Sequence, residues 1–398
     1  MRNIGVVTTS RADYGIYLPV LRRIQDDPTL SLNILVSGMH LLPEFGSTVN
    51  NIEADGFDIS DRVEISLSSD TPEGVAEAMG HGVIGFAKSF ARSKPDILLV
   101  LGDRYEMYSA AAAALPFNIP VAHIHGGESS EGAIDESIRH AITKMSHLHF
   151  VSTTVYGQRV VQMGEEPWRV VISGAPSLDN IKTLDLLSKT ELEQAFDLDL
   201  SKPTLLVTYH PVTLQYENTE HHTREILSSL SEVDFNIVLT YPNADTHGKV
   251  IIELINRFVE QQENAWVVAN LGTQAYFSLM SHVAAMVGNS SSGIIEAASF
   301  QLPVVNIGDR QLGRIRSGNV IDVNHDKNSI LTGIAKATTT EFHHEIETLP
   351  NCYGDGGASE RIVKKLNAVP LDRKLLMKRF YSITETAETI AVGLSNGN

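Results

Sequence analysis

Short apolar runs recur along the whole chain, and helix-like stretches of about 10–20 residues separate them. In order, the runs are Asn3–Thr9, Ser31–Ser37, Asp96–Leu101, Pro120–His125, Leu148–Ser152, Arg169–Ser173, Thr204–Thr208, Asn236–Thr240, Ala265–Ala269, Val283–Val287 and Pro303–Ile307. This alternation is typical of βαβ units, in which a helix connects each strand to the next strand of a parallel sheet. A polar stretch around Asp197–Pro203 separates the first six runs from the rest. The sequence therefore predicts an α/β protein with two doubly wound domains and a cleft between them.

The charge of the chain limits its partners. Acidic residues number 48 and basic residues 31, so the formal net charge is −17. Because such a surface repels phosphate backbones and anionic lipids, we expect neither nucleic acid nor membranes as partners. The chain opens on Met1-Arg2-Asn3 without an apolar signal segment, and the single Cys352 permits no internal disulfide. These features predict a soluble cytoplasmic protein.

Polar clusters follow several of the predicted strands. In open α/β sheets, ligands bind beyond the carboxyl ends of the strands. If both domains direct these ends toward the shared cleft, the clusters converge on one site. They are Thr9–Gly15, Gly102–Arg104, His123–Glu128, Tyr209–Pro211, Tyr241–Asp245 and Gly288–Gly293.

The cluster Gly288–Gly293 lies between a predicted strand and a predicted helix. Its small residues allow a ligand to approach the backbone, and free amides at a helix start favour phosphate. Ser290, Ser291 and Ser292 add hydroxyl donors, and Glu296 is placed to accept both hydroxyls of a ribose. The alternative is a serine N-cap with a capping-box glutamate. The strand–loop–helix context favours nucleotide binding.

Four carboxylates fall near the strand ends of the first domain. Asp103 follows the apolar run Ile97–Leu101, Glu128 belongs to the next cluster, and Asp135 and Glu136 open a helix-like stretch. Clustered carboxylates raise one another's pKa, which suits general acid–base catalysis. Acids at a helix start are also common caps, and capping accounts for at least one of the last two.

Arg11, Arg104 and Arg310 also fall at strand ends. On so acidic a protein, cations in these places indicate an anionic ligand in the cleft. For any single arginine, a salt bridge to a neighbouring acid such as Glu106 is an equal alternative. No C-x-x-C pair and no histidine spacing supports a metal site, so we expect none.

Together these segments resemble the UDP-N-acetylglucosamine 2-epimerases, and more closely the hydrolysing branch that begins sialic-acid-type and legionaminic-acid-type biosynthesis. Non-hydrolysing relatives carry G-T-R-P-E where this chain has Ser10–Tyr14, which favours the hydrolysing branch. Non-hydrolysing and animal relatives carry Glu at the position of His125, and Glu128 is a nearby candidate for its role. The matching segments, in family order, are Ser10–Gly15, Leu101–Arg104, His123–Glu128, Asp135–Lys144, Tyr209–Thr213, Gly288–Gly293 and Gly308–Gln311.

The resemblance implies a GT-B-type fold, in which two Rossmann-like domains enclose the active site and the C-terminal segment crosses back to the first domain. We accordingly expect a sugar-binding, catalytic domain over residues 1–178 and a UDP-binding domain over residues 179–371. A C-terminal helix over residues 372–392 is expected to join the first domain. The resemblance further suggests a homodimer or homotetramer.

The resemblance also implies a reaction. UDP leaves UDP-N-acetylglucosamine by anti-elimination across C1–C2, and water adds to the glycal to release free N-acetylmannosamine. Neither a metal nor a redox cofactor is implied. Similarity places five residues at the sugar as catalytic candidates: Asp103, His125, Glu128, Asp135 and Glu136. It places nine around UDP: Arg11, Arg104, His210, Ser290, Ser291, Ser292, Gly293, Glu296 and Arg310.

Other functions are compatible with the same motifs. UDP-2,4-diacetamido-2,4,6-trideoxyglucose, a legionaminic acid precursor, would undergo the same chemistry. A GT-B glycosyltransferase would share the nucleotide-sugar site but have an acceptor groove in place of a pocket that admits water. A non-catalytic nucleotide-sugar sensor would have no need of several carboxylates at the sugar.

Overall fold

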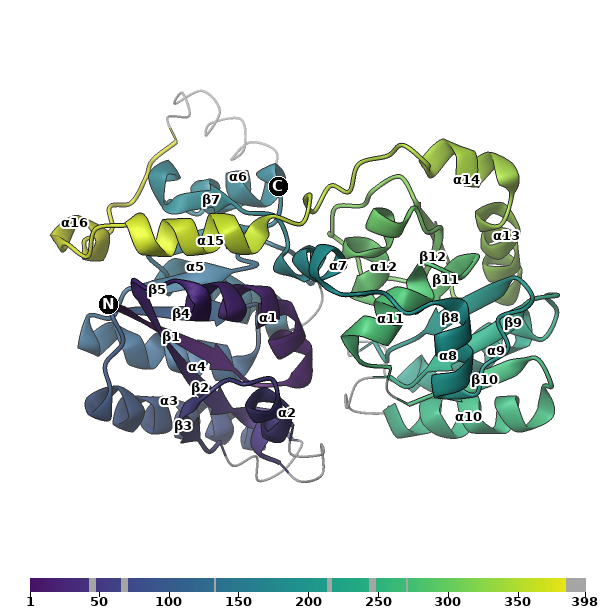
Figure 1. The fold of residues 1–398 in the computed structure, drawn as a ribbon, viewed down its shortest axis with the longest axis horizontal. Helices are drawn as coiled ribbons and strands as arrows, with labels where there is room; N and C mark the ends of the chain where they lie inside the picture. Colours follow the sequence, from purple (N-terminus) through teal and green to yellow (C-terminus); the bar gives the residue numbers. More distant parts are fainter. Residues whose placement is uncertain are drawn as a thin grey trace, which may run out of the picture.

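The computed structural model describes residues 1–42, 48–65, 71–131, 134–212, 217–242, 248–269 and 271–383. Thr213 of one matching segment, residues 243–245 of one polar cluster and residues 384–392 of the expected last helix lie outside these ranges. Two parallel sheets flanked by helices lie side by side (Figure 1). This arrangement confirms the predicted pair of doubly wound domains. No helix of the described ranges is both long enough and apolar enough to cross a membrane.

The first sheet has seven strands in the order β3-β2-β1-β4-β5-β6-β7. Its central strand β4 consists of Ile97–Leu101 and is buried on both faces, as its uninterrupted apolar sequence predicts. The order reverses between β1 and β4, which is where open α/β sheets bind ligands. The other strands are β1 Arg2–Thr8, β2 Leu30–Ser37, β3 Ile59–Val63, β5 Val121–Ile124, β6 Leu148–Val151 and β7 Val170–Ile172.

Several helices of the first domain begin after a side chain that caps them. Ser10 forms a capping box with Asp13 at the start of α1, and Thr71 caps α3 directly before Pro72. These caps fix where each strand-end loop stops and its helix begins. The helices are α1 Arg11–Asp26, α2 Val49–Ala54, α3 Pro72–Arg92, α4 Tyr105–Ala114, α5 Ile134–Met145 and α6 Thr154–Gln162.

The second sheet has six strands in the order β10-β9-β8-β11-β12-β13, with the same reversal between β8 and β11. Its strands are β8 Thr204–Thr208, β9 Asn236–Thr240, β10 Ala265–Val268, β11 Ala285–Gly288, β12 Val304–Ile307 and β13 Val320–Val323. Its helices are α8 Lys189–Phe196, α9 Thr219–Leu230, α10 Gly248–Gln261, α11 Gly272–Met280, α12 Ser291–Ile295, α13 Lys327–Ala337 and α14 Thr340–Ile346.

The chain passes between the domains twice. Helix α7, Asp179–Thr183, leads to the second domain, and the segment after α14 returns to α15, Ala358–Ala368, which lies over the first domain (Figure 1). Helix α15 falls in the range expected for the second domain. It nevertheless packs on α1 and buries Ile362 and Leu366 in the core of the first domain. The chain therefore returns to the first domain at α15, before the position 372 expected from the sequence.

The helix expected over residues 372–392 differs from the structure in its described part. Only α16, Arg373–Leu376, is helical there, and residues 377–383 have no regular structure. The cause is Arg169, a fully buried side chain that donates to the carbonyls of Lys374, Leu375 and Met377. Because these carbonyls serve the guanidinium, the chain does not continue as a helix.

A small apolar cluster joins the domains. It packs Tyr156 of α6 and Leu178 beside Ile294 of α12 and Tyr353 of the returning segment. The two tyrosine hydroxyls lie 3.1 Å apart, and Tyr156 Oη accepts a hydrogen bond from the backbone N–H of Ile315 at 3.0 Å. These contacts place the strand ends of the two sheets close together.

Candidate active site

Asp103 lies in the turn that follows β4. Gly102 before it has a φ of +73°, a left-handed conformation that favours glycine. The Asp103 carboxylate pairs with Arg139 of α5 and accepts a hydrogen bond from the Ser130 hydroxyl at 3.4 Å. Its side chain is 25% exposed, whereas that of Arg139 is 3% exposed. A buried arginine thus fixes a carboxylate that solvent or a substrate can still reach.

His125 and Glu128 form a buried pair after β5. His125 Nδ1 lies 2.5 Å from Glu128 Oε1, and Ser152 donates to the same oxygen at 2.7 Å. His125 has a φ of +63°, which is uncommon for a residue with a side chain and is typical of strained functional sites. Arg139 Nη1 holds this backbone by donating to the His125 carbonyl at 3.1 Å.

The ionisation of Glu128 follows from its neighbours. Burial alone would raise its pKa, but the charges of His125 and Arg314 outweigh burial and hold the pKa well below its usual range. Arg314 Nη1 approaches Glu128 Oε2 to 3.7 Å from the second domain. Glu128 is therefore a permanent carboxylate at ordinary pH.

The start of α5 holds the other two acids of the first domain. Glu136 accepts hydrogen bonds from the Ser130 N–H at 2.5 Å and the Ser129 hydroxyl at 3.2 Å. Burial would raise the pKa of Glu136, but these bonds and His140 lower it. Asp135 lies half-buried in the same first turn. Glu136 is therefore bound to the loop that precedes α5.

In the second domain, Asn289 organises the strand ends. It is fully buried, accepts from the His210 N–H at 2.7 Å and donates to the His210 carbonyl at 2.8 Å. Arg310 and Gln311 donate to the Asn289 carbonyl at 3.1 and 2.9 Å. One asparagine therefore connects the ends of β8, β11 and β12. It brings His210 and Arg310 together beside the cluster Gly288–Gly293, which we call the serine loop.

The serine loop itself is shaped by close packing. Gly288 has a φ of +134°, and a Cβ there would lie 2.0 Å from the Thr208 carbonyl oxygen, so only glycine fits. Ser290 caps α12 and accepts from the Ser292 N–H at 3.3 Å. At the end of this short helix, Ser177 donates a hydrogen bond to Glu296. Burial raises the pKa of Glu296 to about 7, despite the hydrogen bonds it accepts.

The remaining predicted arginines differ in their surroundings. Arg104 lies 3.1 Å from the buried Glu106, which fits the salt-bridge alternative. Arg11 is exposed in the first turn of α1. The structure thus brings together Asp103, His125 and Glu128 on one side, and His210, the serine loop and Arg310 on the other.

Several residues that contact these groups were not predicted from the sequence: Arg139, Ser152, Ser177, Asn289 and Arg314. Asn289 lies inside the serine cluster, and Arg314 follows Arg310 in the same loop, so their neighbourhood was visible in the sequence. Their partners were not, because each contact joins distant parts of the chain. Within the described ranges, no group of three or more His, Cys, Asp or Glu residues is arranged to hold a metal ion.

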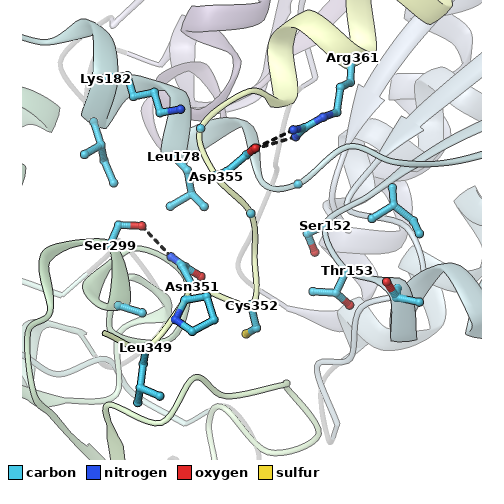
Figure 2. Close-up of a pocket in the computed structure, with 18 of the residues that line it drawn as sticks. Ser152, Thr153, Leu178, Lys182, Ser299, Leu349, Asn351, Cys352, Asp355 and Arg361 are labelled. Atoms are coloured by element: carbon cyan, nitrogen blue, oxygen red, sulfur yellow. Dashed lines mark hydrogen bonds and ion pairs between the residues drawn. The ribbon is translucent and has the colours of Figure 1, made fainter. Parts of the chain in front are cut away.

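A cavity of about 810 Å³ lies at the passage between the domains (Figure 2). Ser152 and Thr153 of the first domain and Asn351 and Cys352 of the returning segment contribute to its wall. None of the predicted site residues lines it. We therefore define the candidate active site by the contacts between the strand ends and not by this cavity.

Comparisons with known proteins agree with this geometry. The sequence profile of the family described as "UDP-N-acetylglucosamine 2-epimerase" matches residues 22–367. The chain is 40% identical over 378 residues to "UDP-N,N'-diacetylbacillosamine 2-epimerase (hydrolyzing)" of Legionella pneumophila, covering 95% of this chain and 99% of the relative. It is also 40% identical over 385 residues to "GDP/UDP-N,N'-diacetylbacillosamine 2-epimerase (hydrolyzing)" of Campylobacter jejuni, covering 96% and 99%.

A solved structure shows the same fold. The UDP-GlcNAc 2-epimerase from Neisseria meningitidis bound to UDP-GlcNAc superposes with a TM-score of 0.79 at 20% identity, covering 92% of this chain and 99% of that one. The protein is thus an α/β enzyme of GT-B-type architecture. The chain belongs to the UDP-N-acetylglucosamine 2-epimerase family, in its hydrolysing branch.

Proposed function

We propose that this enzyme converts a UDP-2-acetamido sugar and water into UDP and the free sugar inverted at C2. The observation that carries the proposal is the ion pair of Arg314 with Glu128, which joins the two groups of strand ends. Carboxylates and an imidazole from one domain thereby lie close to hydroxyls and arginines from the other. This combination suits a reaction that moves protons at a sugar while a diphosphate departs.

The chemistry requires three kinds of group. A base removes the C2 proton as the C1–O bond breaks and its electrons leave with UDP, which produces a glycal. Water then supplies an oxygen to C1, and an acid returns a proton to C2 from the opposite face. Asp103 and His125 are the candidates for these proton transfers. Ser290, Ser291 and Arg310 are the candidates for stabilising the departing diphosphate, with Glu296 at the ribose.

Two sugars are candidates for the substrate. We place UDP-2,4-diacetamido-2,4,6-trideoxyglucose first. Its sugar is also called N,N'-diacetylbacillosamine, and that sugar stands in the names of the two relatives at 40% identity. UDP-N-acetylglucosamine comes second, supported by the more distant solved structure. The two differ at C4 and C6, and a site built to bind a hydroxyl discriminates strongly against its absence.

The test is incubation of the purified enzyme with each UDP-sugar and no acceptor. We expect release of UDP together with a free 2-epimerised sugar, with a higher kcat/KM for the diacetamido substrate. NMR identifies the sugar, and chromatography measures UDP. A glycosyltransferase would be almost idle without an acceptor, and a sensor would bind UDP without turnover. Either result would refute the proposal, and equal or reversed kcat/KM values would refute the substrate order.

A further inference from the structure

Arg314 belongs to the second domain, but its guanidinium lies against the first. Nη1 is 3.7 Å from Glu128 Oε2, and the two side chains are 14% and 2% exposed. Nη1 is buried and makes no hydrogen bond to any residue that the structure describes. Removing two charges from water costs free energy that a pair at this distance repays poorly. The pair therefore contributes little to holding the domains together. A role in the reaction accounts better for the presence of Arg314 beside Glu128.

The loop over residues 308–316 fixes Arg314 from both sides. In the second domain, Gln311 anchors the loop to the Asn289 carbonyl at 2.9 Å. On the first domain, the Ile315 N–H donates to Tyr156 Oη at 3.0 Å. Gly313 has a φ of +78°, and a Cβ there would lie 2.5 Å from Glu131 Oε1. Arg314 thus occupies the point where this loop meets the first domain.

Glu128 in turn orients His125. With Nδ1 held at 2.5 Å from the carboxylate, the imidazole of His125 can exchange a proton with a substrate only through Nε2. A carboxylate that fixes the ring orientation of a proton-transferring histidine is a recurring arrangement in enzymes. The second oxygen of Glu128 faces Arg314, so the arginine acts on the ring through Glu128.

We propose that Arg314 is a positioning residue, which the second domain contributes to the His125–Glu128 pair so that the imidazole is correctly held only when the domains are together. This inference rests on the proposed hydrolysing epimerase activity. It assigns proton transfer at the sugar to His125 Nε2 and orientation to Glu128. It also makes the pair dependent on a residue from the domain that binds UDP.

The pH dependence follows from the groups that face Glu128. Burial raises the pKa values of Tyr156 and Tyr353, so neither ionises in an ordinary assay. Arg314 is one of the charges that lower the pKa of Glu128, so its removal raises that pKa. Activity that needs the carboxylate is then lost at a higher pH as the solution is acidified. The facing groups are His125, Arg139, Tyr156, Arg314 and Tyr353.

The experiment compares Arg314→Met, Arg314→Lys and a control, Arg224→Met, whose arginine is an exposed partner of Glu220 on α9. For Arg314→Met we expect kcat to fall about 10–100-fold, with UDP affinity changed less than about threefold. The acidic limb of its kcat/KM profile should move to higher pH. Arg314→Lys should keep the limb near its original position and recover part of kcat. Arg224→Met should match the wild type throughout.

A double variant separates action through Glu128 from direct contact with the substrate. If Arg314 acts through Glu128, adding Arg314→Met to Glu128→Gln should lower kcat little further. The inference would be overturned if the losses in kcat of the two single variants multiplied in the double variant. It would also be overturned if Arg314→Met bound UDP more weakly while its kcat stayed unchanged. Wild-type kcat and pH profile in both Arg314 variants would also overturn it. An inactive wild type would instead refute the proposed function, and Arg314→Lys remains decisive if Arg314→Met does not fold.

Discussion

The Asp103 side chain is both held in place and accessible. Its backbone is held by the turn after a fully buried strand, and its carboxylate is held by the buried Arg139, yet a quarter of its surface is exposed. The surface pair of Asp61 with Arg92 leaves the carboxylate similarly exposed, but Arg92 is 61% exposed whereas Arg139 is 3% exposed. A proton-transferring carboxylate needs all three features, because it must be fixed, charged and within reach of the substrate.

The first residue-scale prediction is Asp103→Asn, which keeps the size of the side chain but removes its ability to exchange a proton. We expect kcat to fall about 10²–10⁴-fold while UDP affinity changes little. The melting temperature should fall as well, because the buried Arg139 loses its charged partner. The control is Asp61→Asn, because Asp61 is 23% exposed and also pairs with an arginine, Arg92. Near-normal turnover with a lowered melting temperature would mean that Asp103 serves only the ion pair.

Individual residue roles were only partly predictable from the sequence. Arg104 was expected to face either UDP or a neighbouring acid, and the structure pairs it with Glu106. Arg314 could not be singled out, because its closeness to Glu128 arises only when the two domains pack together. Local sequence identifies which side chains lie at strand ends, but tertiary packing decides which of them meet.

At the scale of elements, the serine loop between β11 and α12 shows how backbone geometry prepares a site. Gly288 permits the turn, Asn289 fixes the loop to β8, and Ser290 caps the helix. Ser291 is half-buried at the first helical position. These contacts hold the loop from within the protein, which lowers the entropic cost of binding a diphosphate.

The prediction for this element is Ser291→Asp, which introduces a negative charge where the diphosphate is proposed to bind. We expect the variant to fold and to lose the rise in melting temperature that UDP gives the wild type. Ser201→Asp, in an exposed loop of the same domain, should retain that rise. An unchanged UDP-induced rise in the folded Ser291→Asp variant would exclude the loop from the diphosphate site.

The two strands that the apolar runs omit have a feature in common. The apolar runs omit β3 and β13, which are edge strands with the sequences ISDRV and VIDV. An edge strand is covered on one side only and therefore tolerates the polar residues that interrupt the apolar pattern in these two strands. The other two edge strands, β7 and β10, have apolar sequences and fall within the predicted runs. In the described part of the expected last helix, Arg169 binds the carbonyls of Lys374 and Leu375, and residues 377–383 have no regular structure.

At the scale of the whole molecule, the site exists only because two sheets present their strand ends to each other. The tyrosine cluster at the passage, the bond from Ser177 to Glu296 and the pair of Arg314 with Glu128 all cross this boundary. The sequence predicted two domains and a cleft, because each domain repeats the same alternating pattern. It did not predict the contacts across the cleft, which join residues far apart in the chain.

The central claim is that elimination of UDP is followed by addition of water, with inversion at C2. The most direct measurement is the reaction in D₂O, with the released sugar analysed by NMR and mass spectrometry. Elimination removes the original C2 hydrogen, and hydration of the glycal delivers one from solvent. We therefore predict a free 2-epimer with one deuterium at C2, formed together with UDP. A released sugar that keeps its C2 hydrogen, or its original C2 configuration, would contradict the account.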